Sequence, residues 1–342
     1  MIKIKSEKIK KILCIKPRGI GDIILSTIVL ENLNSAFPHS EIHYLTEEFA
    51  KRSVENNPFV SRILTFNKKD FVLSIIRKVR KEKYDLVFDF WSNPKTAQIT
   101  FLSGAKYRVG YEKRGRKYAY NFIGKAGTMG EHAAEDNLVL LNALNIPIIS
   151  KRIIYQTTKE EKLFAEKFLN ESNIQNEKLL IGIIPSGGWE SKRCDPVKWI
   201  KICQEIQKKY QAQFLILWGP GDEKDATVIS HGLLPPPLLT PKSSFGELSA
   251  LIEKCDLIIA NDSGPMHVSA ALGKPTLGIF GPTDPIAHRP YSANSSYVIH
   301  SELHCIKCTK LVCPYNHECM LALPIEKVMT EVEKLMKLTG KF

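Results

Sequence analysis

The stretch DLIIANDSGPMHVSAALGKPTLGIFGPTDP, Asp256–Pro285, decides the fold of the region around it. Its two short apolar runs predict buried strands, and Gly264–Gly273 between them predicts a helix that a glycine ends. Each strand runs into a polar turn that contains glycine, Asn261–Gly264 after the first and Gly281–Pro285 after the second. Such a strand–helix–strand unit predicts two parallel strands, with both turns at the carboxyl edge of one sheet, where α/β proteins bind ligands.

The same alternation of strands and helices extends over the whole chain. In the first half, strands are expected at 12–15, 41–46, 62–66 and 107–112, with a helix from about Asp22. The alternation restarts after a charged helical segment at 158–174 and continues to a last helix at 324–338. It predicts parallel sheets covered by helices on both faces. Because 342 residues are long for one core, we expect two doubly wound domains, 1–155 and 156–342.

The composition is that of an ordinary globular protein with excess positive charge. No apolar run approaches the roughly 20 residues of a membrane span, and the N-terminal apolar runs are too short for a signal peptide, so we expect a cytoplasmic protein. The net charge of +12 favours anionic partners such as phosphorylated sugars or a membrane surface, although a lysine-rich composition explains it equally well. No nucleic-acid-binding signature is present, and no nucleic acid is expected as a partner.

The turn after the first strand of the opening stretch has the features of an anion site. Asp262 and Ser263 precede the predicted helix, whose free N–H groups and dipole favour a negatively charged group such as a diphosphate. Gly264 would let the anion approach the backbone, and His267 lies one turn further along the helix. Plain capping of a core helix explains the same residues.

The N-terminal turn, in CIKPRGIGDIIL, contains half of a dinucleotide-binding fingerprint. Gly19 and Gly21 are present, but Ile24 occupies the position of the third glycine, which makes an NAD-dependent dehydrogenase a weak alternative. Asp22 opens the following helix and is a candidate general base, or simply a helix cap.

Two further turns add charged side chains. Ser186 and Gly187 follow a buried strand, and Lys192 with Arg193 supplies positive charge that would stabilise a leaving diphosphate. A solvated basic loop is the alternative. Glu223 follows a Gly-Pro-Gly turn, where it would bind a sugar hydroxyl or cap a helix.

Four cysteines are grouped near the C-terminus with the spacing of a metal site. Cys305, Cys308, Cys313 and Cys319 would suit structural zinc or, less well, an iron–sulfur cluster. Reduced thiols packed in a loop are the alternative, since a cytoplasmic protein keeps its cysteines reduced.

Taken together, these motifs resemble glycosyltransferase family 9, the lipopolysaccharide heptosyltransferases. The resemblance implies a GT-B fold of two doubly wound Rossmann-like domains that face each other across a cleft. The first domain would bind the acceptor and the second the nucleotide sugar, with the last helix packing back on the first domain. It also implies inverting transfer of heptose from ADP-heptose to the inner core of lipopolysaccharide, either Kdo-lipid A or a heptosylated core, with no required cofactor. The motifs that carry it are KPRGIGDIILSTIVLENL (16–33), PSGGWESKRCDPVKW (185–199), NDSGPMHVSAALGKPTLGIFGPTDP (261–285) and CIKCTKLVCPYNHECML (305–321).

The resemblance also implies roles for individual residues. Asp22 matches the position of the catalytic base, and Lys192 that of a lysine that contacts the donor phosphates. The implied donor-binding residues are Ser186, Gly187, Arg193, Glu223, Asp262, Ser263, Gly264 and His267, and the implied acceptor-binding residues are Arg18, Gly19 and Gly21.

A lipid-linked acceptor implies a protein at the cytoplasmic face of the inner membrane. The basic stretch RVGYEKRGRKYAYN (108–121) and the basic N-terminus would meet anionic headgroups or core phosphates there, or else form a solvated charged loop. Two other functions fit the same residues. One is a GT-B transferase that uses another nucleotide sugar for a different surface glycan, and the other is a non-catalytic sugar-nucleotide binder.

Overall fold

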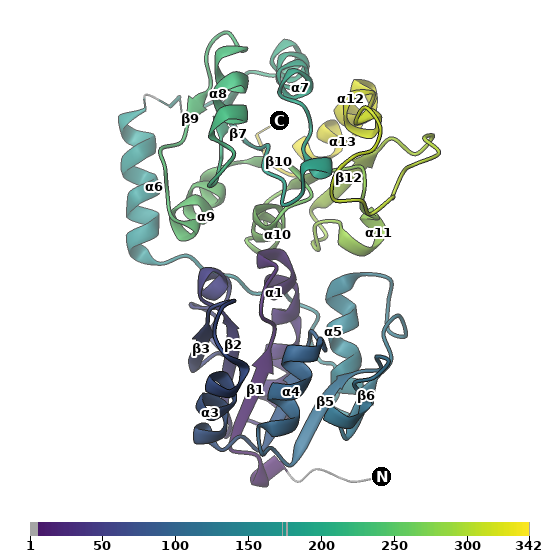
Figure 1. The fold of residues 1–342 in the computed structure, drawn as a ribbon. Coiled ribbons are helices and arrows are strands. Elements are labelled where there is room, and N and C mark those ends of the chain that lie inside the picture. Colours follow the sequence, from purple (N-terminus) through teal and green to yellow (C-terminus); the bar gives the residue numbers. More distant parts are fainter. Residues whose placement is uncertain (1–5, 173, 176, 342) are drawn as a thin grey trace. The chain divides into compact units, whose positions relative to one another are not determined.

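The structure, a computed structural model, describes residues 6–172, 174–175 and 177–341. The chain divides into an N-terminal unit, Met1–Tyr155, and a C-terminal unit, Gln156–Phe342. Each unit contains a six-stranded parallel sheet with helices packed on it, which confirms the predicted α/β class (Figure 1). Across the described residues, every helix is too short or too polar to traverse a bilayer.

The sheet of the N-terminal unit has the strand order β3-β2-β1-β4-β5-β6. β1 lies between β2 and β4, with Ile12 opposite Ile42 on one side and Leu86 on the other. The chain therefore builds outward from β1 in one direction, returns, and builds from β4 in the other, which creates a switch point between β1 and β4. The strands are β1 (Lys11–Ile15), β2 (Glu41–Glu47), β3 (Arg62–Phe66), β4 (Leu86–Asp89), β5 (Tyr107–Tyr111) and β6 (Phe122–Gly124).

Helices cover this sheet on both faces. α3 and α4 pack side by side, and their apolar side chains join alternate residues of the central strands in one core (Figure 1). α1 and the short helix η2 pack against α5. The elements are η1 (Ser6–Lys8), α1 (Ile20–Ser26), η2 (Thr27–Val29), α2 (Leu30–Ala36), η3 (Glu48–Ser53), α3 (Val72–Glu82), α4 (Pro94–Leu102), η4 (Lys117–Ala119) and α5 (Ala133–Asn142).

The C-terminal unit repeats this topology with the order β12-β11-β10-β7-β8-β9, so its switch point lies between β7 and β10. A core of apolar side chains from α7, α8 and α13 packs against the strands, with Trp199 fully buried in it. The strands are β7 (Leu179–Ile184), β8 (Ala212–Ile216), β9 (Leu238–Leu239), β10 (Leu257–Asn261), β11 (Thr276–Phe280) and β12 (Ser295–Ile299). The helices are α6 (Lys159–Glu171), η5 (Glu190–Lys192), α7 (Pro196–Lys209), α8 (Glu223–His231), α9 (Phe245–Lys254), α10 (Gly264–Ala271), α11 (Pro285–His288), α12 (Glu318–Leu321) and α13 (Ile325–Met336).

Local signals set where the helices begin. In α4, the Asn93 side chain accepts from the Thr96 N–H at 2.8 Å and Thr96 Oγ1 accepts from the Asn93 N–H, a capping box with Pro94 at the first helical position. α1 begins at Ile20, two residues before the predicted start, because Gly19 at φ 82° turns the chain directly from β1 into the helix.

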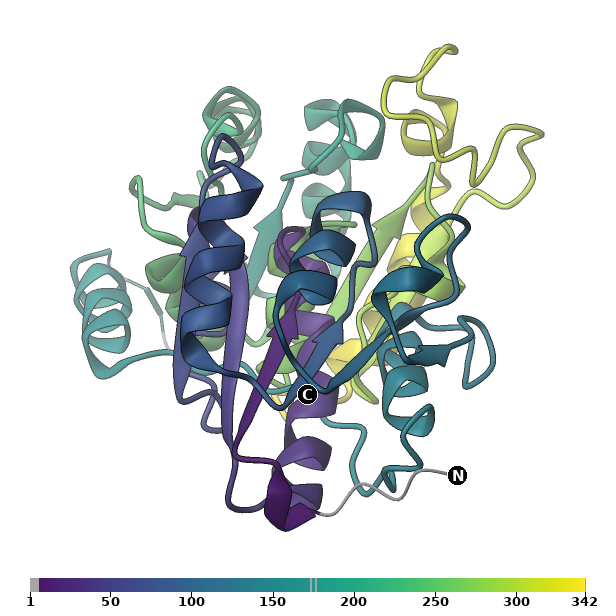
Figure 2. The same ribbon diagram turned by 60° about the horizontal axis from the view of Figure 1, so that its bottom comes forward.

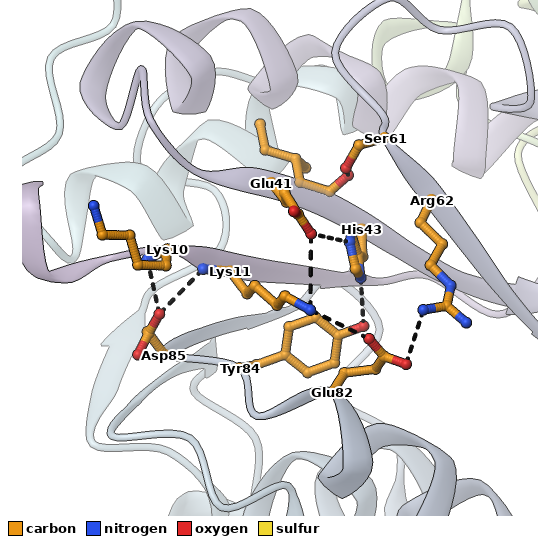
Figure 3. Close-up of polar contacts among 10 residues, drawn as sticks. Lys10, Lys11, Glu41, His43, Ser61, Arg62, Glu82, Tyr84 and Asp85 are labelled. Carbon is orange, nitrogen blue, oxygen red and sulfur yellow. Dashed lines mark hydrogen bonds and ion pairs between the residues drawn. The ribbon is translucent and has the colours of Figure 1, made fainter.

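A polar network at the amino-terminal edge of the first sheet ties α3 to the strands (Figure 3). Glu82, at the end of α3, accepts from Lys11 at 3.5 Å and from Arg62 at 2.9 Å. His43 is buried beside it, with Nδ1 2.9 Å from the Tyr84 hydroxyl and Nε2 3.1 Å from Glu41. Burial lowers the pKa of His43, while Glu41 opposes that change. This network uses the acidic side chain of α3, so the other face of the helix keeps only positive charges.

Candidate active-site residues in the two units

Each unit gathers polar side chains at the carboxyl edge of its sheet, beside the switch point. In the N-terminal unit these side chains follow β1, β4 and β5, and in the C-terminal unit they follow β7, β10 and β11. Loops at a switch point diverge to opposite faces of the sheet, which leaves room for a ligand between them. The two sets are therefore candidate ligand sites.

The N-terminal unit has a pocket of about 420 Å³ at this edge. It holds two carboxylates, three basic side chains and several aromatic rings, so it combines charged groups with flat apolar surfaces. Its lining residues are Lys16, Asp22, Leu25, Phe90, Trp91, Ser92, Asn93, Tyr111, Lys113, Arg116, Ala126, Ala133, Asp136 and Asn137.

Asp22 reaches this pocket from the first turn of α1, and Gly19 makes its position possible. A Cβ atom at residue 19 would lie 2.1 Å from Oδ2 of Asp22, so the carboxylate occupies space that only glycine leaves open. Gly21 lies in the same helical turn, whereas Arg18 is exposed in the preceding loop and does not line the pocket. Of the residues predicted near β1, Asp22 is thus the side chain that faces the pocket.

Lys16 and Trp91 form one wall of the pocket, and sequence reasoning did not single out either residue. The Lys16 ammonium donates to the Phe90 carbonyl at 3.0 Å and lies 5.0 Å from the centre of the Trp91 ring. Burial lowers the pKa of Lys16, while the nearby carboxylates of Asp22 and Asp89 counteract that change. A half-buried cation therefore lies within electrostatic reach of the candidate base.

Asp89 holds the turn that carries Trp91. Its side chain is fully buried and accepts hydrogen bonds from the N–H groups of Trp91 and Ser92 and from the Tyr120 hydroxyl, at 2.8–3.0 Å. Burial raises the pKa of Asp89, and these donors oppose the rise. The aromatic wall is consequently fixed by the backbone of its own turn, as a preformed binding surface requires.

The remaining charges make the pocket net positive. Lys113 and Arg116, from the loop after β5, add to Lys16, and Asp136 and Asp22 are the carboxylates. Lys113 also lowers the pKa of Lys16, and both side chains line this pocket. A pocket with three cations, an aromatic wall and two carboxylates can hold an acidic sugar and accept a proton from it.

In the C-terminal unit, Lys192 and Asp262 meet although they lie 70 residues apart in sequence, and they follow the neighbouring strands β7 and β10. Their ammonium and carboxylate groups are 2.7 Å apart, and Thr283, after β11, donates to the same Asp262 oxygen at 2.6 Å. Lys192 also lies 4.4 Å from the centre of the Trp189 ring. The structure thus brings two predicted site residues together with the turn after β11.

The start of α10 lies beside this ion pair. Ser263 is its N-cap residue, Gly264 is its first residue, and His267 is buried in the next turn. The Ser263 side chain makes no capping hydrogen bond, so the first N–H groups of α10 are not satisfied by it. A lysine ammonium next to an uncapped helix start is a favourable place for a phosphate group.

Arg193, a predicted donor-binding residue, contacts the turn before α8, and the predicted residue Glu223 follows that turn. Arg193 forms an ion pair with Asp222 at 2.7 Å, and Asp225 lies 3.5 Å away. Glu223 is the exposed first residue of α8. Asp222 is buried and was missed from the sequence, although it follows the same Gly-Pro-Gly turn.

The loop after β7 is shaped to bring Arg193 close to its own start. Ser186 is half-buried at the end of β7, and Gly187 is buried beside it. A Cβ atom at Gly187 would lie 2.9 Å from Cγ of Arg193, so a larger residue would push the arginine stem away. Gly187 therefore contributes close packing of this loop.

The cysteine-containing loop, 305–319, lies against two turns of the candidate donor site. Backbone groups of the loop bond to the turn after β11, and its residues 310, 311 and 313 bond to η5, which ends at Lys192. The backbone contacts are Lys307 N to Gly281 O (3.1 Å), Thr309 N to Pro282 O (2.7 Å) and Ser191 N to Leu311 O (3.2 Å). The loop thus braces the segments that carry Lys192 and Thr283.

The four predicted metal ligands lie near one another in this loop as free thiols. Burial, together with smaller contributions from the neighbouring Cys313, Cys305 and Cys308, raises the pKa of Cys319 to about 11. Over the part of the chain that the structure describes, His, Cys, Asp and Glu side chains form no group of three or more placed to hold a metal ion.

Known proteins resemble this chain over nearly its whole length. The chain is 26% identical to lipooligosaccharide heptosyltransferase 2 of Campylobacter jejuni over 93% of its length and 97% of the relative's. It superposes on a family 9 glycosyltransferase from Veillonella parvula with a TM-score of 0.84, at 23% identity and coverages of 96% and 97%. It also superposes on the E. coli heptosyltransferase WaaC with ADP, with a TM-score of 0.73, at 18% identity and coverages of 95% and 99%.

These structural likenesses confirm the predicted GT-B type of fold. The model of glycosyltransferase family 9 (heptosyltransferase) matches residues 72–318, which is well over half of the chain. The match includes Trp91 and Lys113 of the pocket as well as Lys192 and Asp262 of the C-terminal unit. The protein is therefore a glycosyltransferase that belongs to family 9, the heptosyltransferases.

Proposed function

We propose that this protein transfers heptose from ADP-heptose to the inner core of lipopolysaccharide, with Kdo-lipid A or a heptosylated core as acceptor, and inverts the anomeric centre. The observation that carries the proposal is the Asp22 carboxylate in a net-positive, aromatic-walled pocket of a family 9 chain. The names of the relatives support it, since the Campylobacter protein is a lipooligosaccharide heptosyltransferase and the E. coli structure contains ADP.

On the acceptor side, Asp22 acts as the general base. It takes the proton of an acceptor hydroxyl while the hydroxyl oxygen attacks the anomeric carbon of the donor. Lys113 and Arg116 hold acidic groups of the acceptor, and the Trp91 ring supports a sugar face. Each role uses a side chain that lines the one pocket, so the hydroxyl and the base would share a small volume.

On the donor side, Lys192 and the start of α10 hold the diphosphate. The bond between the anomeric carbon and the diphosphate oxygen breaks as the new glycosidic bond forms, through an oxocarbenium-like transition state. Lys192 and the free N–H groups near Ser263 stabilise the negative charge that develops on ADP, and Asp262 positions Lys192. This chemistry needs one base and charge stabilisation, and no cofactor takes part in it.

Domain roles follow from the same assignment. The N-terminal unit binds the acceptor and the C-terminal unit binds the nucleotide sugar, because the base and the lysine lie in different units. A lipid-linked acceptor places the enzyme at the cytoplasmic face of the inner membrane as a peripheral protein.

For loop 305–319 we propose a structural role, since it braces the turns that carry Lys192 and Thr283. Structural zinc would strengthen this role if the four thiols closed around the ion. Metal analysis of the purified protein tests whether the four thiols bind zinc. About one equivalent of zinc, lost when Cys308 and Cys313 are changed to Ser, is the expected result. Metal-free protein with full activity would refute the zinc site.

Release of ADP that depends on both donor and acceptor tests the transfer reaction. Wild-type protein with ADP-heptose and Kdo-lipid A should release ADP, and Asp22→Asn should do so about 10²–10⁴-fold more slowly while binding ADP equally well. Calorimetric ADP binding shows that the variant is folded. Binding without any ADP release would indicate another sugar, another acceptor or a non-catalytic binder. A folded wild-type protein that binds no nucleotide would overturn the donor site.

A further inference from the structure

One side of α3 carries basic and apolar side chains that point away from the sheet. Ile75, Ile76 and Val79 are the buried residues of the helix. The opposite side exposes Leu73 and the cations, and Phe71 at the N-cap is 85% exposed, compared with 61% for Leu73. We call Phe71, Leu73, Arg77, Lys78 and Lys81 the α3 surface.

The cations of the α3 surface are not neutralised by neighbouring acids. Glu82, the acidic residue of α3, turns to Lys11 and Arg62 at the edge of the sheet (Figure 3). Within the residues that the structure describes, Arg77, Lys78 and Lys81 enter no ion pair. Three positive charges at positions i, i+1 and i+4 of one helix repel each other, so a surface of this kind favours an anionic partner.

The two apolar side chains lie at the end of α3 nearest the pocket. β3 ends at Phe66 on the carboxyl edge of the sheet, and the segment 67–71 leads from that edge into the helix. Lys95, at the start of α4, fixes this segment by donating to the Asp70 carbonyl at 3.3 Å. Figure 2 shows α3 and α4 side by side along the N-terminal unit. The apolar end of the α3 surface and the pocket of Asp22 therefore share one edge.

We propose that the α3 surface binds an anionic lipid bilayer. Phe71 and Leu73 enter the boundary between headgroups and acyl chains, and Arg77, Lys78 and Lys81 contact lipid phosphates. Peripheral binding needs two signals, an apolar anchor and a basic cluster, and this surface provides both. A nucleic acid would use the cations but would leave Phe71 and Leu73 in water, so the pair of signals favours lipid.

This inference extends the proposed function, because a lipid-linked acceptor has to reach the pocket from a bilayer. It also locates membrane contact on α3, rather than on the basic stretch 108–121 expected from the sequence. Vesicle binding does not require heptose transfer, so an experiment can contradict either proposal without contradicting the other.

Co-sedimentation of the full-length protein with vesicles tests the surface. Wild-type protein should bind vesicles of phosphatidylglycerol and phosphatidylcholine, and should not bind phosphatidylcholine alone. The triple variant Arg77→Gln, Lys78→Gln, Lys81→Gln should bind the anionic vesicles about 100-fold more weakly. The matched control is Lys167→Gln, Lys201→Gln, Lys224→Gln, which removes three exposed cations of the C-terminal unit and should stay within about threefold of wild type.

The apolar part of the surface is tested at constant charge. Phe71→Ser with Leu73→Ser should weaken vesicle binding at least tenfold, and a tryptophan in Phe71→Trp should be quenched by brominated lipid only in anionic vesicles. Equal losses in the triple variant and its control would overturn the α3 surface. Binding to an RNA duplex that is unaffected by Phe71→Ser and Leu73→Ser, without vesicle binding, would overturn lipid as the partner. With a water-soluble acceptor the triple variant should release ADP at the wild-type rate. A loss of vesicle binding can then be told apart from a failure of the transferase proposal.

Discussion

Replacement of Gly19 by alanine should separate the placement of Asp22 from the stability of the fold. The residue has φ 82°, and a methyl group on it would lie 2.1 Å from Oδ2 of Asp22. Gly104, after α4, has almost the same φ of 83°, but a methyl group there would meet no atom within 4 Å. Gly104→Ala is therefore a matched control, which shares the positive φ and lacks the collision.

The expected magnitudes follow from this difference. An alanine at positive φ costs roughly 1–3 kcal/mol of unfolding free energy, so both variants should lose stability in that range. The collision at residue 19 involves the end of a flexible side chain, and the Asp22 carboxylate can relieve it by rotating away. Transfer should then fall by about 10²–10⁴-fold in Gly19→Ala, the usual contribution of a general base, and should stay near wild type in Gly104→Ala.

Two measurements decide the outcome. Urea denaturation followed by circular dichroism gives the unfolding free energy of each variant, and acceptor-dependent ADP release gives its turnover. Full turnover in Gly19→Ala would show that the absence of a side chain at residue 19 does not determine the position of the Asp22 carboxylate. Loss of turnover in Gly104→Ala to the same extent would show that stability, rather than the carboxylate, controls the rate.

Three other perturbations test different parts of the structure. Lys192→Met leaves the buried Asp262 carboxylate without its cation, so unfolding free energy should fall by about 3 kcal/mol and calorimetric ADP binding should weaken; unchanged stability would contradict the ion pair. Trp91→Ala should raise the acceptor KM at least tenfold with little change in ADP binding, and an unaltered KM would exclude the ring as a sugar platform. Because burial lowers the pKa of His43, the unfolded state takes up a proton first, and unfolding free energy should decrease as the pH falls below about 6.5. His43→Gln should flatten that decrease, and an identical pH profile would refute the assignment.

The periodic elements of the fold were predictable from local sequence, whereas short and irregular elements were not. The strands expected at 41–46, 62–66 and 107–112 are confirmed as β2, β3 and β5. β6 and β9 were missed, because edge strands of three and two residues contain too few positions for a pattern. α4 was also missed because its buried face includes two threonines while Phe101 is exposed, so its apolar residues show no helical spacing, although Asn93 and Pro94 mark its start.

The candidate sites were predictable to the extent that turns after strands reveal them. Asp22, Lys192 and Asp262 were found because each follows a buried strand with glycine nearby. Lys16 and Trp91 were missed because their contact depends on β1 lying beside β4, and Lys16 bonds to a carbonyl 74 residues further along the chain. That pairing results from the strand order of the whole sheet, and no local pattern contains it.

The environments of Asp22 and Asp262 give a physical reason for assigning them different roles. Both residues lie where a switch-point strand leads into a helix, so sequence position alone does not distinguish them. Oδ2 of Asp262 already accepts from Lys192 at 2.7 Å and from Thr283 at 2.6 Å, so this carboxylate is engaged in holding the lysine ammonium in place. Asp22 enters no ion pair in the described part of the chain, and it lies in the pocket with Lys113 and Arg116, which can bind the acceptor. The paired carboxylate therefore suits the positioning of a cation for the leaving group, and the unpaired one suits proton removal, which is the division of labour that single-step inversion requires.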